Sequence, residues 1–291
     1  MSEHVPVMLL EVLESLSPKS GEVYLDATFG GGGYTKAILD KENCNVIAMD
    51  KDPEAITRSE LIKKSNSNRF HIFQDSFANA SSYISEKSLD GAVFDLGVSS
   101  FQIDNASRGF SFQKDGPLDM RMSNHGITAE EIVNNYDEKE IADILYYYGE
   151  ERKSYQIARS IIREREKKPI LSTLDLSRCV TSVTPRIPGK SHPATKTFQA
   201  LRIYLNNELQ DIQDALQNLI PLLKNNARIV VVTFHSLEDR IIKNFFKINN
   251  NCISSIHKKT INPSDEEINK NYRSRSAKLR AAIFNEISNS K

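Results

Sequence analysis

Apolar runs and amphipathic stretches alternate over the first hundred residues. The apolar runs are at 23–28, 45–50, 69–74 and 89–98, with stretches of helical spacing at 34–41, 52–64 and 78–86. Continuous apolar runs of this length are typical of parallel strands that are buried on both faces. Asp52 followed by Pro53 marks the start of the second helix. The pattern predicts an α/β fold in which strands and helices alternate around a parallel sheet.

The strand pattern then stops after Asp95 and resumes only with ARIVVVTF at 227–234. Pairs with capping spacing, Thr128 with Glu131 and Ser172 with Asp175, introduce helices in between. We expect helices at 128–134, 138–149, 151–167, 172–183 and 195–223, then a strand, a helix, and strands near 252–258 and 277–284 around a polar linker at 260–272. The sequence therefore predicts an all-helical domain at 106–206, inserted into a sheet domain made of 1–105 and 207–291.

Composition and cysteine content exclude several classes of protein. The 291 residues are 39% hydrophobic and 26% charged, an ordinary globular balance. Cys44, Cys179 and Cys252 lie far apart without a C-x-x-C pair, so neither a disulfide framework nor a zinc site is indicated. No uncharged stretch approaches the ~20 residues that span a bilayer, and we expect a cytosolic protein without membrane contact.

The net charge of zero conceals two basic stretches. Residues 151–206 hold 12 Lys and Arg against 4 Asp and Glu, and residues 251–291 hold 8 against 4. The rest of the chain is acidic. Basic stretches of this kind suit a phosphate backbone, because Lys and Arg displace its condensed counterions. Solvated helix faces are an equally good explanation from charge alone.

The strongest local feature is the glycine run Gly30–Gly33, which lies between the first predicted strand and its helix. Glycines here allow positive φ angles and close approach of a ligand to the backbone. The spacing departs from the dinucleotide fingerprint, since Thr35 and Lys36 occupy the positions of its last glycine, and no P-loop lysine follows. The run predicts a nucleotide-like ligand, with a plain flexible turn as the alternative.

Further candidate ligand contacts follow the predicted strands. Asp50 comes 20 residues after Gly30, where an acidic side chain can accept hydrogen bonds from both ribose hydroxyls. Phe77 follows the third strand, where a ring can pack on adenine or simply belong to the core. Asp26, Asp50 and Asp95 end strands, so we expect them to converge at the carboxyl edge of the sheet.

Other chemistries lack their motifs. The segment 95–100 (DLGVSS) does not continue into a hydrolase elbow, because Phe101 occupies the position of its last glycine. No H-x-E motif with a distant P-C-x-x-C supports a zinc deaminase, and the six histidines form no H-x-x-x-H pair. We therefore predict no metal site.

Ten ordered segments together resemble the bacterial cytosine-N4 methyltransferases of small-subunit ribosomal RNA, which use S-adenosylmethionine. They are 4–7 (HVPV), 28–33 (TFGGGG), 50–53 (DKDP), 95–100 (DLGVSS), 108–112 (RGFSF), 116–121 (GPLDMR), 192–195 (HPAT), 198–202 (FQALR), 234–240 (FHSLEDR) and 274–280 (SRSAKLR). The chain departs from the family pattern at Tyr34, where His is common, and at Tyr272, where Pro is common. The resemblance covers nearly the whole chain.

The resemblance implies a class I (Rossmann-like) S-adenosylmethionine-dependent methyltransferase sheet carrying a helical substrate-recognition domain. It also implies methylation of one cytidine in the decoding region of 16S ribosomal RNA, within the small ribosomal subunit, and leaves open whether the chain forms a homodimer. The cofactor contacts it implies are Gly32, Gly33, Tyr34, Asp50, Phe77, Asp95 and Gln102.

The catalytic and substrate contacts are hypotheses built on the matched motifs. A carboxylate can accept a hydrogen bond from the N4 amino group of cytosine, so Asp95 is the first candidate for orienting it, with Ser99 or Ser100 as helpers. Asp95 could equally serve only the cofactor. Arg108, Arg121, Arg202 and His235 are candidate contacts to phosphate or base, with structural ion pairs as the alternative. Binding to the RNA phosphates that does not depend on the RNA sequence would come from five basic residues of the insertion: Arg152, Lys153, Arg159, Arg163 and Arg165.

Three other functions compete with this prediction. A class I methyltransferase could act on protein or on a small molecule, and composition does not distinguish these acceptors. An RNA-binding assembly factor could keep the fold without turnover, although it would not need the glycine run, Asp50 and Asp95. A nicotinamide oxidoreductase is the third alternative, which thermal stabilisation by one cofactor or the other would separate.

Overall fold

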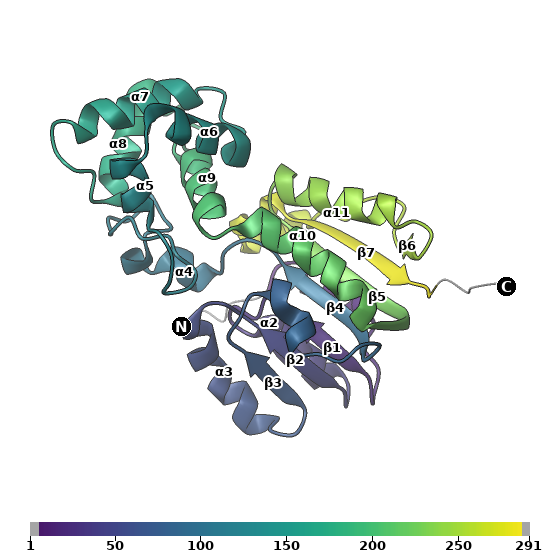
Figure 1. Cartoon of the computed structure of the whole chain (residues 1–291). Helices are drawn as coiled ribbons and strands as arrows, with labels where there is room; N and C mark the ends of the chain where they lie inside the picture. The colour runs from purple at the N-terminus through teal and green to yellow at the C-terminus, as the bar shows by residue number, and fades with distance from the viewer. Residues whose placement is uncertain (1–5, 287–291) are drawn as a thin grey trace. The chain divides into compact units, whose positions relative to one another are not determined.

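The computed structural model describes residues 6–286, and His4 of the first matched segment lies outside them. The chain forms two compact units (Figure 1). One contains the described residues up to Gly97 and from Leu209 onward, and the other is Val98–Glu208. The second unit thus begins at Val98, where the sequence pattern predicted a boundary after residue 105.

The first unit contains a seven-stranded sheet with the strand order β3-β2-β1-β4-β5-β7-β6. The strands are β1 Val23–Asp26, β2 Asn45–Met49, β3 Phe70–Phe73, β4 Leu89–Asp95, β5 Leu223–Thr233, β6 Ile253–Ser255 and β7 Lys278–Phe284. β1 to β5 pair in parallel, whereas β7 is antiparallel to β5 and to β6. The predicted class I methyltransferase sheet is confirmed.

Helices accompany this sheet along the chain. They are α1 Leu9–Leu16, α2 Gly33–Lys41, α3 Pro53–Ser65, α10 Glu208–Leu219, α11 Ser236–Ile248 and α12 Asp265–Lys270, with 3-10 turns at Phe77–Ser82, Ile220–Leu222 and Tyr272–Ser276. The predicted start of α3 is confirmed, because Asp52 accepts the backbone N–H of Glu54 at 3.0 Å and Pro53 is the first helical residue.

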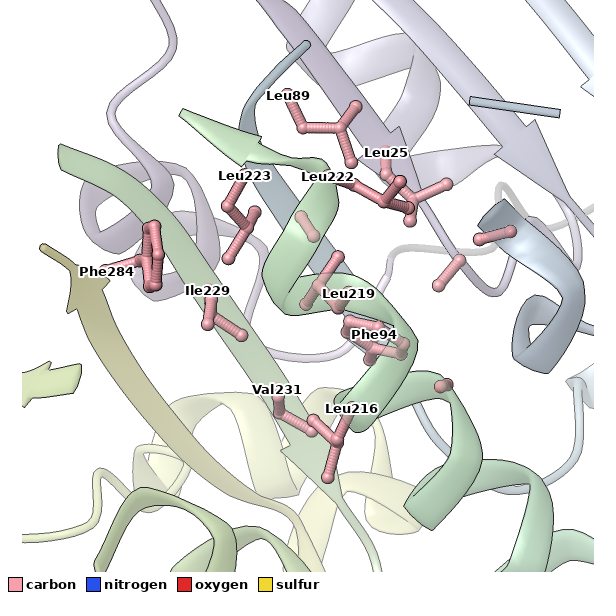
Figure 2. Packing of buried hydrophobic residues seen from close by; sticks show 14 of the residues in the cluster. Leu25, Leu89, Phe94, Leu216, Leu219, Leu222, Leu223, Ile229, Val231 and Phe284 are labelled. Atoms are coloured by element: carbon pink, nitrogen blue, oxygen red, sulfur yellow. The ribbon is translucent and has the colours of Figure 1, made fainter. Parts of the chain in front are cut away.

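The sheet is buried on both faces. Along β5, Ile229 and Val231 belong to one hydrophobic cluster, and Val230 and Val232 belong to another. Because successive side chains of a strand point to opposite faces, the two clusters cover the two sides of the sheet. Figure 2 shows the first of them, with α10 residues such as Leu216 packed beside the strands. The continuous apolar runs in the sequence follow from this double burial.

The second unit is helical. It contains α4 Ser100–Asp104, α5 Ala129–Asn135, α6 Glu138–Gly149, α7 Ser154–Arg165, α8 Thr173–Val183 and α9 Thr195–Leu205, with a 3-10 turn at Ala106–Arg108. Helices α5 to α9 share one hydrophobic core, which includes Leu118, Ile132, Leu145, Ile157 and Leu201. Among the described residues of this unit, extended backbone pairs only at an isolated bridge between Pro117 and Ser172.

Three sequence predictions differ from the structure. The helix expected at 195–223 is broken, because Asn207 adopts a positive φ of 56° between α9 and α10. The helix expected at 78–86 is the shorter 3-10 turn Phe77–Ser82. The polar linker expected at 260–272 contains α12, where Ser264 accepts the backbone N–H of Glu267 as an N-cap.

Candidate functional site

The glycine run connects β1 to α2 and needs its glycines for conformation and for space. Gly30 and Gly32 have φ angles of 54° and 75°, in the left-handed region that favours glycine. A Cβ on Gly32 would lie 2.6 Å from the Phe29 ring. A Cβ on Gly33 would overlap the ring of Pro6, so the chain near the N-terminus crosses directly over this loop.

Asp50, at the end of β2, holds the glycine loop in place. One carboxylate oxygen accepts the backbone N–H of Gly30 at 2.7 Å, and the other accepts that of Asp52 at 2.8 Å. Arg58 on α3 donates to the carbonyl of Gly30 at 3.2 Å. The sequence predictions brought Asp50 and the glycine run together but did not include Arg58. A ligand contact by Asp50 would use the lone pairs that these backbone bonds leave available.

Asp26 ends β1 and is fully buried. Its carboxylate accepts the hydroxyl of Thr35 at 2.6 Å and the backbone N–H of Thr28 at 3.2 Å. Burial raises the pKa of Asp26 to about 6, against the lowering effect of these hydrogen bonds. Asp26 therefore ties the start of α2 to the strand and adds a carboxyl group beneath the loop.

Asp95 ends β4, next to β1 in the sheet. Its backbone N–H donates to the hydroxyl of Thr28 at 2.6 Å, which links β4 to the segment leading into the glycine run. Its Oδ1 is buried and makes no hydrogen bond with any described residue. Burial, then repulsion from Asp26 and Glu238, raises the pKa of Asp95 to about 8. A buried carboxylate oxygen without a partner is costly, so this position suits a ligand that donates a hydrogen bond or carries positive charge.

Glu238 is a site residue that the sequence predictions did not assign. It is fully buried in the first turn of α11, and its Oε2 accepts the backbone N–H of Phe234 at 2.7 Å. His235 caps the helix by accepting the N–H of Glu238, and its Nε2 lies 3.0 Å from Glu238 Oε1. The spacing of a capping residue and an acid three positions later is the signal that could have identified Glu238.

Two predicted cofactor contacts, Tyr34 and Phe77, differ in how their rings are used. The Tyr34 side chain is buried, and its hydroxyl donates to the carbonyl of Val7. It therefore secures the chain that crosses the glycine loop, and only its backbone remains for a ligand. Phe77 is partly exposed at the end of the β3 connection and meets Phe94 edge-on at 5.8 Å, so part of its ring surface is accessible to a ligand.

Ser99, Ser100 and Gln102 belong to the helical unit. Ser99 accepts the N–H of Gln102 at 3.3 Å, and Gln102 Oε1 accepts the N–H of Ser99 at 3.0 Å, which together form a capping box at the start of α4. Ser100 is the first residue of that helix. The structure shows this local role for Ser99 and Gln102, and their contacts to cofactor or substrate stay predictions.

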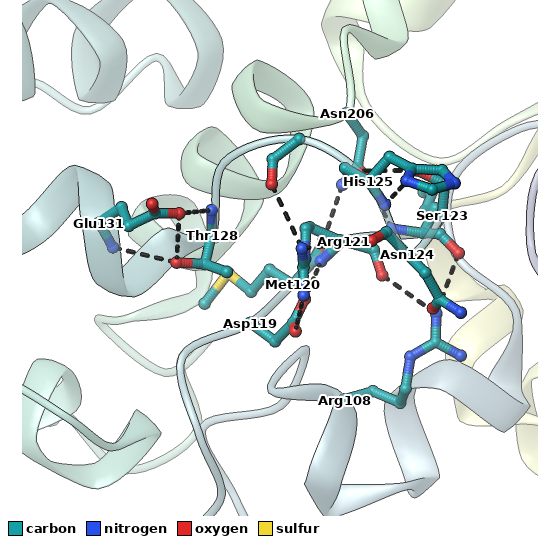
Figure 3. Close-up of polar contacts among 12 residues, drawn as sticks. Arg108, Asp119, Met120, Arg121, Ser123, Asn124, His125, Thr128, Glu131 and Asn206 are labelled. Atoms are coloured by element: carbon teal, nitrogen blue, oxygen red, sulfur yellow. Dashed lines mark hydrogen bonds and ion pairs between the residues drawn. The ribbon is translucent and has the colours of Figure 1, made fainter.

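The three candidate substrate arginines make internal contacts. Arg108 donates to the carbonyls of Arg121 and Met122, both at 3.0 Å, and Arg121 pairs with Asp119 at 2.8 Å (Figure 3). Arg202 forms a two-bond pair with Glu208. These contacts are the structural alternative to an RNA role, and such a role stays a prediction for each of them.

The basic residues of the insertion are engaged to different degrees. Arg165 donates to the carbonyls of Val133 and Tyr136, at 2.9 and 2.6 Å, and so completes the end of α5. Arg159 and Arg163 are exposed and pair with Glu138 and Glu164. Exposed pairs of this kind are weak, so these two arginines can exchange a carboxylate for a phosphate at little cost.

The described residues contain no cluster of three or more His, Cys, Asp or Glu side chains that could hold a metal ion. Within residues 6–286, no helix is both long and apolar enough to cross a membrane.

A family model and two relatives that match over almost their full length indicate the same family. Residues 1–285 match the MraW methylase family. A ribosomal RNA small subunit methyltransferase H from Rickettsia massiliae (strain Mtu5) is 50% identical, over 97% of this chain and 98% of its own. One of the same name from Rickettsia felis (strain ATCC VR-1525 / URRWXCal2) is 49% identical, over 96% and 97%. A solved rRNA methylase from Streptococcus thermophilus has a TM-score of 0.46 at 11% identity, covering 96% of this chain and 94% of that one.

Proposed function

The chain belongs to the MraW methylase family, and on that premise we propose that it methylates small-subunit ribosomal RNA with S-adenosylmethionine. The acceptor we propose is the exocyclic N4 of cytidine 1402 in 16S RNA. The relatives that are 50% identical over almost their full length carry the name ribosomal RNA small subunit methyltransferase H, which supports the substrate class. The ten matched segments support the choice of cytosine N4.

The observation that carries the proposal is the Asp95 carboxyl at the end of β4. In an open α/β sheet, ligands bind at the carboxyl ends of the strands where the strand order reverses, and here β1 and β4 flank that point. Asp95 presents a buried oxygen without a hydrogen-bond partner among the described residues, beside the segment that carries the glycine run. An amino group of a substrate or a cofactor would supply the missing donor.

The charges around Asp95 suit S-adenosylmethionine. Asp26 and Glu238 lie close enough to Asp95 to raise its pKa, so the site has an excess of carboxyl groups. A cationic ligand relieves that repulsion, whereas the pyrophosphate of a nicotinamide cofactor would add to it. Gly32 and Gly33 would hold the cofactor through the backbone, with Asp50 and Phe77 at its ribose and adenine and Gln102 as a further contact. When bound, the cofactor supplies a methyl group activated by its sulfonium.

Asp95 then has two tasks at the acceptor base. The lone pair of the cytosine amine is conjugated with the ring, so the amine must be held with its nitrogen directed at the methyl group. Asp95 would accept one N4–H hydrogen bond and fix that orientation, with Ser99 or Ser100 as helpers. As the new N–C bond forms, the bond between the methyl group and the sulfur would break, and the nitrogen gains positive charge and must lose a proton. Burial and the neighbouring carboxyls raise the pKa of Asp95 to about 8, so the group is mostly protonated at pH 7 in the free protein; a cationic ligand beside it would favour the carboxylate, which can then take that proton.

The target base must leave its stack before the reaction. An exocyclic amine cannot reach a buried carboxylate while its base is paired, so the substrate is single-stranded or flipped out. We propose that His235 and the exposed arginines Arg152, Arg159 and Arg163 contact the RNA, and that the enzyme acts in the cytoplasm on the small ribosomal subunit or its RNA.

The test is a methyl-transfer assay with nucleoside analysis. The purified protein is incubated with labelled S-adenosylmethionine and with small subunits lacking the modification, in parallel with the free RNA. We expect N4-methylcytidine at one position, and at least a hundredfold lower rate with D95N. The control D40N changes an exposed aspartate on α2 and should retain the wild-type rate. Label in another nucleoside, or in protein, would refute the proposed acceptor.

A further inference from the structure

Three matched segments that are far apart in the sequence meet at one aromatic stack in the helical unit. The rings of Phe112 and His192 stack with their centroids 4.5 Å apart and their planes 15° apart. Phe112 also meets the ring of Phe198 edge-on at 5.4 Å. The stack is therefore built from the segments 108–112, 192–195 and 198–202, and nothing in the catalytic proposal above uses it.

The stack runs from the core to the surface. Phe198 on α9 is buried, whereas Phe112 and His192 are partly exposed, so the imidazole is the outer ring. His192 Nδ1 accepts the backbone N–H of Ala194 at 3.2 Å, which fixes the ring and leaves Nε2 as a donor. Burial, and then the nearby Arg186, lower the pKa of His192, so the ring is neutral at pH 7. A fixed, neutral ring resting on a phenylalanine is a surface on which another flat ring can stack.

The chain leading to His192 is basic. Residues 184–196 contain Arg186, Lys190 and Lys196 and no acidic residue. Lys196 donates to the carbonyl of Glu150 at 2.9 Å. Arg186 and Lys190 are exposed, and neither forms an ion pair with a described residue. They differ in this from Lys167 and Lys168 of the same unit, which pair with Glu164 and Asp175.

We propose that the Phe112–His192 stack, with Arg186 and Lys190 beside it, is a binding site for a base of single-stranded RNA and its neighbouring phosphates. Single-stranded RNA is recognised by stacking bases on aromatic rings and by cations along its backbone, and this surface offers both. A paired duplex fits less well, because its bases are already stacked. The inference rests on the proposed function for the RNA, but it does not depend on which atom of the RNA is methylated.

Replacing the imidazole tests the stacking. The probe is a fluorescent single-stranded RNA of about 12 nucleotides with 2-aminopurine at one position, titrated with the full chain. We expect H192A to weaken binding about tenfold and to lose the emission change of 2-aminopurine, because stacking of one base on an aromatic ring has about that value. H192F keeps an aromatic ring and should bind within about twofold of wild type. H125A is the control, because it removes an exposed histidine elsewhere in the same unit.

Replacing the cations tests the phosphate contacts. R186Q/K190Q should reduce the slope of log affinity against log salt by about 1.4, since each single-strand phosphate contact contributes about 0.7. The control K63Q/K64Q removes two exposed lysines of α3, in the other unit, and should leave the slope unchanged. The proposal is overturned if the wild type does not bind the oligonucleotide, if H192A binds like wild type, or if H192F is as weak as H192A.

Binding and methylation can fail separately. Oligonucleotide affinity is an equilibrium measurement without turnover, so it reports on the stack even if the wild type forms no N4-methylcytidine. Conversely, normal methylation by H192A together with unchanged RNA affinity would refute the proposed RNA site at the Phe112–His192 stack and would leave the proposed function intact. The S-adenosylmethionine affinity of H192A should equal that of the wild type, because the proposed change concerns RNA alone, whereas its melting temperature should fall because the Ala194 N–H loses its acceptor.

Discussion

The carboxylate of Asp50 accepts the backbone N–H of Gly30 at 2.7 Å, so the end of β2 determines where the glycine loop lies. A loop with positive φ angles has little intrinsic preference for one conformation, and this hydrogen bond selects one. Since the second oxygen of Asp50 accepts the N–H of Asp52, the same side chain also joins the loop to the start of α3. Asp50 therefore shapes the proposed cofactor site even before any ligand contact is considered.

Removing this carboxylate should weaken cofactor binding. D50A leaves the N–H groups of Gly30 and Asp52 without their acceptor, and losing a hydrogen bond to a charged group costs about 1.5–3 kcal/mol. We expect the Kd for S-adenosylmethionine, measured by titration calorimetry, to rise about 10- to 100-fold. D50N, which keeps one acceptor oxygen, should lie between. D40N is the matched control. An unchanged Kd for D50A would show that the glycine loop keeps its conformation without the Asp50 carboxylate.

Gly32 should be less replaceable than Gly21. Both have strongly positive φ angles, 75° and 82°, but a Cβ on Gly21 meets nothing within 4 Å, whereas one on Gly32 meets the buried Phe29 ring at 2.6 Å. G21A should cost only the backbone penalty of about 1–2 kcal/mol. G32A should cost about 1–3 kcal/mol more, because the ring must move. Urea unfolding of the two variants measures the difference, and equal losses would mean that Phe29 adapts freely.

Asp95 should make the protein less stable as the pH rises. Its pKa is raised from 3.8 to about 8 in the folded state, so the folded chain binds a proton that the unfolded chain has released. Its contribution to stability is therefore complete below about pH 4 and is lost as the pH approaches 8. Asp26 acts in the same direction, but its window ends near its folded pKa of about 6.

Comparing D95N with the wild type between pH 6 and 8 isolates this effect. The free energy of unfolding of the wild type should fall relative to that of D95N, by at most about 1.4 kcal/mol per pH unit. Urea unfolding at several pH values gives both curves, and D40N should run parallel to the wild type. Parallel curves for D95N would mean that the carboxyl group is not held in its neutral form.

Local signals predicted much of the fold and part of the site. The Asp52–Pro53 helix start, the parallel strands and the helical stretch after Asp95 depend on neighbouring residues or on burial of whole strands, and both leave a pattern in the sequence. The expected convergence of Asp26 and Asp95 followed from strand ends alone, and Thr28 connects the two, because its backbone N–H donates to Asp26 and its hydroxyl accepts the backbone N–H of Asp95. Such features need no knowledge of long-range contacts.

Features that depend on distant partners could not be predicted. The hydroxyl of Tyr34 binds the carbonyl of Val7, and Arg108 binds the carbonyls of Arg121 and Met122, contacts that exist only once loops have folded. The break after α9 has the same origin, since the Asn206 side chain donates a hydrogen bond to the carbonyl of Met120 and accepts one from the backbone N–H of Met122. Helical spacing continues through this point, so the pattern predicted one long helix.

Arg202 is the candidate residue for which a structural role and an RNA-binding role can best be distinguished by experiment. Its guanidinium meets Glu208 through two hydrogen bonds of 2.8 and 2.9 Å, with side chains that are 13% and 7% exposed. A buried pair of this kind is costly to break on one side, because the remaining charge stays in a poorly solvated place. R202M or E208L alone should therefore destabilise the protein by about 3–5 kcal/mol.

The double variant R202M/E208L should recover most of that loss, since neither charge remains, and a double-mutant cycle by urea unfolding measures the coupling. The exposed pair Lys139–Asp143 serves as the control cycle and should give about 0.5 kcal/mol or less. If Arg202 is structural, the double variant also keeps its KM for RNA within about threefold of wild type, below the tenfold that 1.4 kcal/mol of lost binding would give. Recovered stability with a strongly raised KM would instead show that the guanidinium contacts RNA, because repairing the pair cannot replace a lost phosphate contact.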